Sequence, residues 1–166
     1  MVPMLFIAPL AGAVEAALKA APPGPILVLG SPRLARGLAE RSGRRVIAAL
    51  ASPRRRRRRD PETLACDERA LPVAEGSLAA VVAAGAGEHL DWRERFAEWA
   101  RVVTPGGAIV LVDPGAGRAR ATEFSRRALC AGLTEIEQRQ VGRSLLTSGR
   151  VVYPDYAAIS SRSASG

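Results

Sequence analysis

Short and almost wholly apolar runs, separated by amphipathic segments, form the main pattern of this 166-residue chain. Five such runs predict strands of a sheet, and the run at residues 46–50 is typical of a strand covered on both faces, because a half-exposed strand would alternate apolar and polar residues. These predicted strands span residues 26–29, 46–50, 63–66, 78–84 and 108–112. Segments with apolar residues at helical spacing predict helices over residues 10–21, 33–41, 91–103 and 118–131.

Proline, glycine and capping residues predict where several of these elements begin or end. The run Pro22-Pro23-Gly24-Pro25 ends the first helix, because proline lacks the backbone donor that a helix interior needs. Asp91 with Glu94 three residues later predicts a capping box at the start of the third helix. Pro105-Gly106-Gly107 predicts a turn before the last of the five strands.

The end of the chain has a different pattern, in which two strand-like segments follow each other directly. Strands alternating with helices and then a hairpin predict an α/β fold: a mostly parallel sheet with a C-terminal antiparallel hairpin and helices on both faces. The hairpin strands are expected over residues 133–141 and 144–153. We expect a single domain over residues 1–156, with a strand or extended arm at 1–9 and a disordered tail at 157–166.

The net charge of +8 is concentrated in one place. Six consecutive arginines lie between the second and third predicted strands: Arg54, Arg55, Arg56, Arg57, Arg58 and Arg59. This run predicts contact with an acidic protein or a nucleic-acid backbone. A solvated loop in an arginine-rich chain is the alternative interpretation. No aromatic residues are interleaved with the arginines, which argues against a stacking platform for single strands.

The residues that could hold a metal are few and scattered. Cys66, Cys130 and His89 show no metal-ligand spacing, so we expect no metal site, no disulfide and a cytoplasmic, reducing location. Both cysteines are expected to be small buried apolar groups. The apolar run at residues 4–14 is not preceded by a basic residue, since the first is Lys19, which argues against a signal peptide. No apolar run is long enough to span a membrane.

The most informative local stretch is the first predicted strand, at residues 26–29, with the turn and helix that follow. A strand, a glycine turn and a helix are typical of folds that bind nucleotides over the strand ends. Gly30 and Ser31 are therefore candidate cofactor-binding residues. Arg33 and Arg36 at the helix start could bind an anion instead, and a tight structural turn is a third interpretation.

Two stretches are similar to the class I S-adenosylmethionine-dependent methyltransferases, specifically to the type-11 methyltransferase domain. Residues 98–107, Glu-Trp-Ala-Arg-Val-Val-Thr-Pro-Gly-Gly, resemble the family pattern E-x-x-R-V-L-x-P-G-G. Residues 67–82 resemble the family stretch that begins with an acid and contains Leu-Pro and Gly-Ser. The similarity covers residues 10–153 and implies a Rossmann-like methyltransferase fold, S-adenosylmethionine as cofactor and methyl transfer as activity.

The resemblance also implies which positions would bind the cofactor. Gly30 and Ser31 correspond to the glycine loop, Asp67 to the acid near the adenine, and Leu50 to the acid that holds the ribose hydroxyls. Pro32 stands where the loop has its second glycine. At two further positions where the family has an acid, this chain has the apolar residues Val28 and Ala79. This pattern predicts a degenerate site that binds no cofactor, or binds S-adenosylmethionine only if the remaining groups suffice.

Three functional hypotheses follow. The preferred one is a non-catalytic pseudo-methyltransferase that binds a macromolecular partner through Arg54–Arg59. The alternative is an active S-adenosylmethionine-dependent methyltransferase of a small molecule, with Glu88 and His89 as catalytic candidates. The third is a structural subunit, in which a face with Trp92 and Trp99, or the N-terminal arm, mediates homo-oligomer formation.

Overall fold

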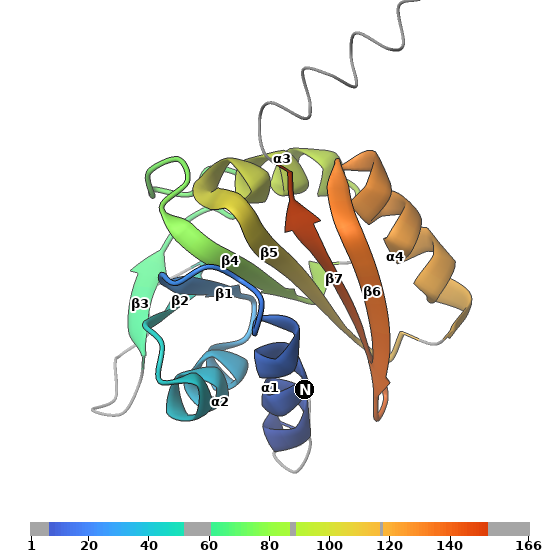
Figure 1. Cartoon of the computed structure of the whole chain (residues 1–166), viewed down its shortest axis with the longest axis horizontal. Helices are drawn as coiled ribbons and strands as arrows, with labels where there is room; N and C mark the ends of the chain where they lie inside the picture. Colours follow the sequence, from blue (N-terminus) through green and yellow to red (C-terminus); the bar gives the residue numbers. More distant parts are fainter. Residues whose placement is uncertain (1–6, 52–60, 87–88, 117, 153–166) are drawn as a thin grey trace, which may run out of the picture.

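All seven strands that the structure describes pair in one sheet, in the order β3-β2-β1-β4-β5-β7-β6 (Figure 1). The structure is a computed structural model that describes residues 7–51, 61–86, 89–116 and 118–152. The strands are β1 (Ile26–Leu29), β2 (Val46–Leu50), β3 (Glu62–Ala65), β4 (Leu78–Ala84), β5 (Val103–Pro114), β6 (Leu133–Val141) and β7 (Ser144–Val151). The helices are α1 (Ile7–Ala17), α2 (Pro32–Ser42), α3 (Trp92–Val102) and α4 (Arg118–Cys130).

The first five strands run parallel, whereas β7 and β6 add an antiparallel hairpin beside β5. The helices cover both faces: α1 and α2 lie on one side of the sheet and α3 and α4 on the other (Figure 1). This architecture is the Rossmann-like methyltransferase fold that the sequence predicts. None of the helices in the described part of the chain is long and apolar enough to cross a membrane.

The core has two layers because successive side chains of a strand point to opposite faces. On β1, Val28 packs towards α1 and α2, whereas Leu27 and Leu29 pack towards α3. On β4, Val82 belongs to the first layer and Val81 to the second, and all five side chains are fully buried. Strands buried on both faces explain why these segments are continuous apolar runs.

The first helix differs from the prediction at both ends. It begins at Ile7, inside the expected N-terminal arm, and ends at Ala17, before the expected Ala21. Pro22 disfavours the α conformation only at the residue before it, Ala21, which is the last residue of the predicted helix. Residues 1–6 of the predicted arm, and residues 153–166 with the predicted tail, lie outside the described residues.

The predicted turn at Pro105-Gly106-Gly107 is wrong, because these residues lie inside strand β5. The pairing of β4 with β5 jumps from Leu78–Val103 to Ala80–Ala108, so the residues between Val103 and Ala108 form a bulge. Gly106 takes a φ of 79°, which favours glycine, and the strand then resumes its register. The backbone therefore bends at the bulge, and β5 pairs with β4 on both sides of it.

Side-chain burial corrects two further expectations. Cys130 is exposed at the end of α4 and Cys66 is only half-buried, so neither is a fully buried apolar group. Trp99 is 1% exposed and lies in the core, which removes it from any surface for self-assembly. Trp92 is half-buried, with the guanidinium groups of Arg93 and Arg127 at 5.3 and 5.5 Å from its ring centre.

Candidate functional site

The candidate site lies at the carboxyl ends of β1, β2 and β4. The chain places β2 and β3 on one side of β1, then returns to place β4 and β5 on the other side. Such a reversal is the point where open α/β sheets bind ligands, because the loops after neighbouring strands diverge there. The sequence-predicted residues Gly30, Ser31, Leu50 and Asp67 all follow or end strands at this edge.

Gly30 is required by the backbone next to it. Its φ is 77°, and a Cβ atom at this position would lie 2.5 Å from the carbonyl oxygen of Ala84, the last residue of β4. A side chain is therefore excluded both by the conformation and by the close approach of β4. The predicted tight structural turn is present, and it needs no ligand to explain the glycine.

Ser31 caps helix α2. Its Oγ accepts a hydrogen bond from the Leu34 amide at 3.2 Å, and its carbonyl oxygen accepts one from the Ala35 amide at 3.1 Å. Pro32, at the first helical position, has no N–H to offer. The first turn of α2 therefore presents few free amides to an anion, because Pro32 has none and the Leu34 amide is already bonded to Ser31.

The end of β2 is apolar. Leu50 closes this strand with a half-buried side chain, and its carbonyl oxygen accepts a hydrogen bond from the Cys66 amide at 3.0 Å. Val28, the other apolar replacement on this side of the site, is fully buried in the core layer below α2. Neither position can accept a hydrogen bond from a ribose hydroxyl through its side chain.

Asp67 is bound by its own neighbour, Arg69. Its Oδ1 accepts hydrogen bonds from the Arg69 backbone amide at 2.9 Å and Nε at 3.2 Å, and its Oδ2 accepts one from Nη2 at 2.9 Å. The side-chain bonds from this guanidinium lower the pKa of the Asp67 carboxyl to about 2. Asp67 is consequently an ionised carboxylate at neutral pH, and its oxygens already have donors.

Three further charged side chains, Asp91, Arg95 and Glu68, extend this pair towards helix α3. Nε of Arg69 lies 4.0 Å from Oδ2 of Asp91, while Nε of Arg95 donates to Oδ1 of Asp91 at 2.9 Å. Arg95 also pairs with Glu68. Asp91 therefore makes no capping hydrogen bond, and the predicted capping box is wrong because Arg95 holds the carboxylate. Its spacing of four residues from Arg95 is a sequence signal that could have shown this.

Only one of the two catalytic candidates lies within the residues that the structure describes. His89 is half-buried in the loop between β4 and α3, and its backbone amide donates to the Ala86 carbonyl oxygen at 3.4 Å. Glu88 lies outside the described residues, as do the partner-binding candidates Arg54–Arg59. The connection that contains these arginines leaves the sheet at Leu50, next to the candidate site.

The stretch that most resembles the family motif has a structural role. Oε1 of Glu98 accepts the backbone amide of Leu71 at 2.8 Å, and Arg101 donates to both oxygens of Glu98 at 2.6 and 2.9 Å. Arg101 also donates to the carbonyl oxygens of Leu71 and Val73 at 3.1 and 3.3 Å. These two side chains therefore fasten the loop before β4 to helix α3.

Other chemistry is sparse in the described part of the chain. No group of three or more His, Cys, Asp or Glu side chains in residues 7–51, 61–86, 89–116 and 118–152 is arranged to hold a metal ion. Asp113 is a buried carboxylate near the end of β5, at the same edge as Gly30. Its backbone carbonyl oxygen accepts the Ala116 amide at 3.4 Å, as a turn requires.

Comparison with known structures places this fold among methyltransferases. The partner of the Trm112 methyltransferase activator from Haloferax volcanii matches with a TM-score of 0.73 and 16% identity, over 89% of this chain and 90% of that one. A SAM-dependent methyltransferase from Aquifex aeolicus gives 0.71 and 14%, over 91% and 94%. The [4+2]-cyclase SpnF gives 0.70 and 12%, over 88% and 81%.

Sequence comparison gives the family. No curated protein sequence is significantly similar to this chain. The family described as a methyltransferase domain matches residues 29–111, from the end of β1 into β5, which is half of the 166-residue chain. That stretch contains residues 67–82 and 98–107, on which the resemblance rests, and also the candidate cofactor positions Gly30 and Leu50. The chain therefore belongs to the methyltransferase domain family, in its class I, type-11 group.

Proposed function

We propose that this protein is a non-catalytic methyltransferase-like module whose S-adenosylmethionine site is degenerate and which binds a macromolecular partner. One observation carries the proposal: the strand ends that would grip a nucleoside offer apolar or already bonded side chains. Leu50 and Val28 are apolar, the Ser31 hydroxyl accepts the Leu34 amide, and Asp67 is held by Arg69. The residues present therefore do not fit the cofactor that the family binds.

The expected loss of affinity follows from these contacts. A hydrogen bond to a charged group contributes about 1.5–3 kcal/mol, so a ribose without its carboxylate acceptor loses roughly that amount. Pro32 removes a hydrogen-bond donor at the start of α2. The Cβ atoms of Ser31 and Pro32 also leave less room for the cofactor to approach the backbone than glycine would. A total of about 4 kcal/mol would weaken a micromolar site roughly a thousandfold.

The comparisons support a function that need not be methyl transfer. One similar structure is a [4+2]-cyclase, so the fold is compatible with other activities. Another is the protein that binds the Trm112 activator, so this fold can present a surface to a protein partner. We propose Arg54–Arg59 as the contact here, with an acidic protein or a nucleic-acid backbone as the ligand.

Calorimetry with S-adenosylmethionine and S-adenosylhomocysteine is expected to show a Kd of about 1 mM or weaker. Leu50→Glu restores a carboxylate at the end of β2 and is expected to tighten binding roughly ten- to a hundredfold. Leu129→Glu makes the same change on the exposed side of α4, where Leu129 is 61% exposed, and should leave the Kd unchanged. A micromolar Kd for the unaltered protein would contradict the proposal and favour an active enzyme that uses Asp67, Glu88 or His89.

Replacing all six arginines of the run by serine is expected to weaken binding to a nucleic acid or to an acidic polypeptide by at least tenfold at low salt. The affinity of the unaltered protein should fall steeply with salt, because released counterions drive such contacts. A control with serine at three exposed arginines elsewhere, Arg93, Arg126 and Arg143, removes charge without touching the run. Equal binding by the six-serine variant and the unaltered protein would rule out this contact.

A further inference from the structure

Strand β6 forms one edge of the sheet, and in the described part of the chain no strand pairs with its outer side (Figure 1). Such an edge presents N–H and C=O groups that can pair with another chain. Glu135, with a φ of 51°, lies in a bulge that interrupts the first part of β6. From Glu137 to Val141 the strand is regular, because each residue pairs in turn with β7. This regular part of the edge, residues 137–141, is open to a partner strand.

The backbone of β6 turns alternate residues outwards. The Gly115 amide donates to the Arg143 carbonyl oxygen at 2.8 Å, so Arg143 turns its backbone groups towards β5. Successive residues of a strand turn these groups to opposite sides, so Ser144 and every second residue after it turn theirs towards β6. Their partners in β6 are Val141, Arg139 and Glu137. The N–H and C=O groups of Gln138 therefore point away from the sheet, as do those of Gln140.

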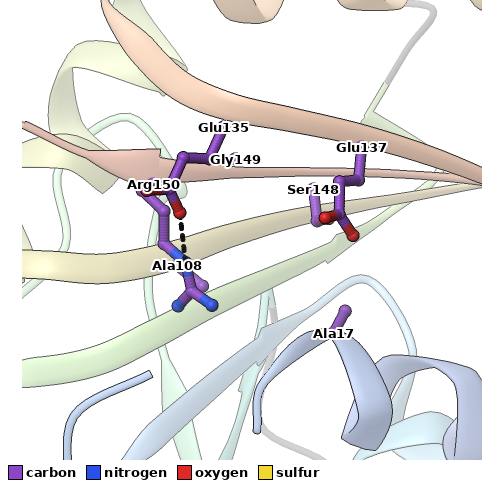
Figure 2. A pocket seen from close by; sticks show the side chains of 7 residues that line it. All are labelled: Ala17, Ala108, Glu135, Glu137, Ser148, Gly149 and Arg150. Atoms are coloured by element: carbon purple, nitrogen blue, oxygen red, sulfur yellow. Dashed lines mark ion pairs between the residues drawn. The ribbon is translucent and has the colours of Figure 1, made fainter. Parts of the chain in front are cut away.

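The two charged side chains of this segment share a face of the sheet. Nε2 of Gln138 donates to the Ala121 carbonyl oxygen at 2.7 Å, which places Gln138 on the α4 face. Glu137 and Arg139 take the opposite face, because successive side chains of a strand alternate. Figure 2 shows Glu137 pointing from β6 towards the side where Ala17 of α1 lies. Both charged side chains are exposed, and neither forms an ion pair with another described residue.

A second copy of this chain fits the edge in one register. Two identical edges that pair about a two-fold axis perpendicular to the sheet run antiparallel, with their α1 faces on the same side. Placing Gln138 opposite Gln138 joins the outward backbone groups of both copies. It also sets Glu137 of each copy opposite Arg139 of the other, in a non-hydrogen-bonded pair whose side chains lie close together. Opposite charges in such cross-strand pairs are favourable, and the symmetry provides two of them.

The neighbouring registers bring like charges together. Placing Gln138 opposite Ile136 sets Glu137 against Glu137, and placing it opposite Gln140 sets Arg139 against Arg139. A shift by a single residue brings outward backbone groups opposite groups that already face β7. A parallel pairing about a two-fold axis would set each charged residue beside its own copy. Like charges directly opposite are destabilising, so the charge pattern selects the register with Gln138 at its centre.

We propose that this protein forms a two-fold dimer in which the β6 strands of two copies pair antiparallel, with Gln138 opposite Gln138 and two symmetric Glu137–Arg139 ion pairs. The contact joins the seven-stranded sheets of the two copies into one. It uses few residues of each copy, so we expect a Kd of about 10–100 µM, weaker than that of a standard interface. The carboxyl ends of β1, β2 and β4 stay free, so the dimer is independent of the proposed loss of cofactor binding.

Analytical ultracentrifugation of the full chain measures this Kd, at about 0.15 M salt, where the repulsion between two copies of net charge +8 is screened. Glu137→Arg and Arg139→Glu each set like charges opposite each other and should weaken the dimer at least tenfold. The double variant, Glu137→Arg with Arg139→Glu, restores both pairs and should dimerise as the unaltered protein does. Arg93→Glu, at an exposed position of α3, is the matched control for Arg139→Glu and should leave the Kd unchanged.

Gln138→Pro tests the backbone pairing, because it removes the outward N–H and no hydrogen bond between β6 and β7. It should abolish the dimer, whereas Gln138→Ala loses the same side-chain contacts, keeps the N–H and should still dimerise. The charge variants change exposed side chains only, so they test the dimer even if Gln138→Pro does not fold. Three results would each overturn the proposal: a monomer at roughly ten times the expected Kd, a dimer that survives Gln138→Pro, or no recovery in the double variant.

Discussion

Gly107→Ala is expected to lower the free energy of unfolding by about 3 kcal/mol or more, because the bulge in β5 leaves no room for a methyl group. A Cβ atom at this position would lie 2.6 Å from the Ala79 carbonyl oxygen, 2.8 Å from the Thr104 carbonyl oxygen and in collision with Cγ1 of Val103. Two of these three obstacles are backbone atoms, which cannot rotate away. Relief would require β4 and β5 to separate where they pair in the middle of the sheet.

Gly12→Ala is the matched control, since it adds the same methyl group inside helix α1. The nearest atom to the new Cβ would be Nη2 of Arg41 at 3.3 Å, the end of a flexible side chain that is 48% exposed. Alanine is a better helix former than glycine by about 1 kcal/mol, so this variant should be as stable as the unaltered protein or more stable. Urea denaturation followed by circular dichroism measures both, and equal unfolding midpoints for the two variants would contradict the steric argument.

Arg101→Met is expected to lower the free energy of unfolding by more than the same change at Arg126, because it leaves three polar groups without their donor. Glu98, with a side chain only 15% exposed, would lose its ion pair, and the carbonyl oxygens of Leu71 and Val73 would lose their hydrogen bonds. The loop from Leu71 to Val73 would then be held to α3 by the Glu98–Leu71 bond alone, so it should also exchange its amide hydrogens faster.

Arg126→Met provides the comparison, because Arg126 and Glu123 form a pair of the same type and spacing on the outside of α4. Their side chains are 67% and 38% exposed, and exposed pairs contribute less than about 1 kcal/mol. Both variants lose an arginine–glutamate pair, so the difference between their losses of stability measures the contribution of burial and of the hydrogen bonds to the carbonyl oxygens. Equal losses of stability would show that the contacts to the loop before β4 contribute nothing.

The same pair predicts a dependence on pH. Hydrogen bonds from Arg101 lower the pKa of the Glu98 carboxyl below its ordinary value. A carboxyl whose pKa is lowered on folding adds stability above its unfolded pKa, near 4.3, and loses it as the pH falls through the folded pKa. The stability gap between the unaltered protein and Arg101→Met should therefore be constant from neutral pH to about pH 5 and should narrow below about pH 4.

These contacts explain how a family motif can be present beside a cofactor site that we propose to be degenerate. Glu98 and Arg101 hold the loop before β4, and Gly107 permits the bulge in β5, so the motif stabilises the sheet without touching a ligand. A chain that stops binding the cofactor still needs this sheet. Stability of the sheet does not require an acid at the positions of Leu50 and Val28, because apolar side chains there are compatible with the strands.

The apolar pattern alone was enough to predict most of the sheet. The strands at residues 26–29, 46–50 and 78–84 have the bounds that their apolar runs predict, because continuous burial on both faces requires continuous apolar sequence. The alternation of strands and helices, followed by two adjacent strands, predicts the parallel sheet with its antiparallel hairpin. Apolar residues at the cofactor positions, Leu50 among them, are likewise visible without a structure.

Tertiary contacts decided the features that depend on residues distant in the sequence. Pro105-Gly106-Gly107 is a turn by composition, and only pairing with β4 makes it a bulge within a strand. Arg69, in the loop after β3, lies 4.0 Å from the Asp91 carboxylate and extends the local Asp91–Arg95 pair into an ion-pair cluster, which the spacing of these residues does not predict. The bulge at Glu135 in β6 likewise depends on the pairing with β7, which aligns Thr134 with Arg150 and Glu137 with Ser148. The periodicity of the local sequence determines on which face of a helix or strand a side chain lies. The residue that this side chain contacts in a neighbouring element is determined only by how the elements pack.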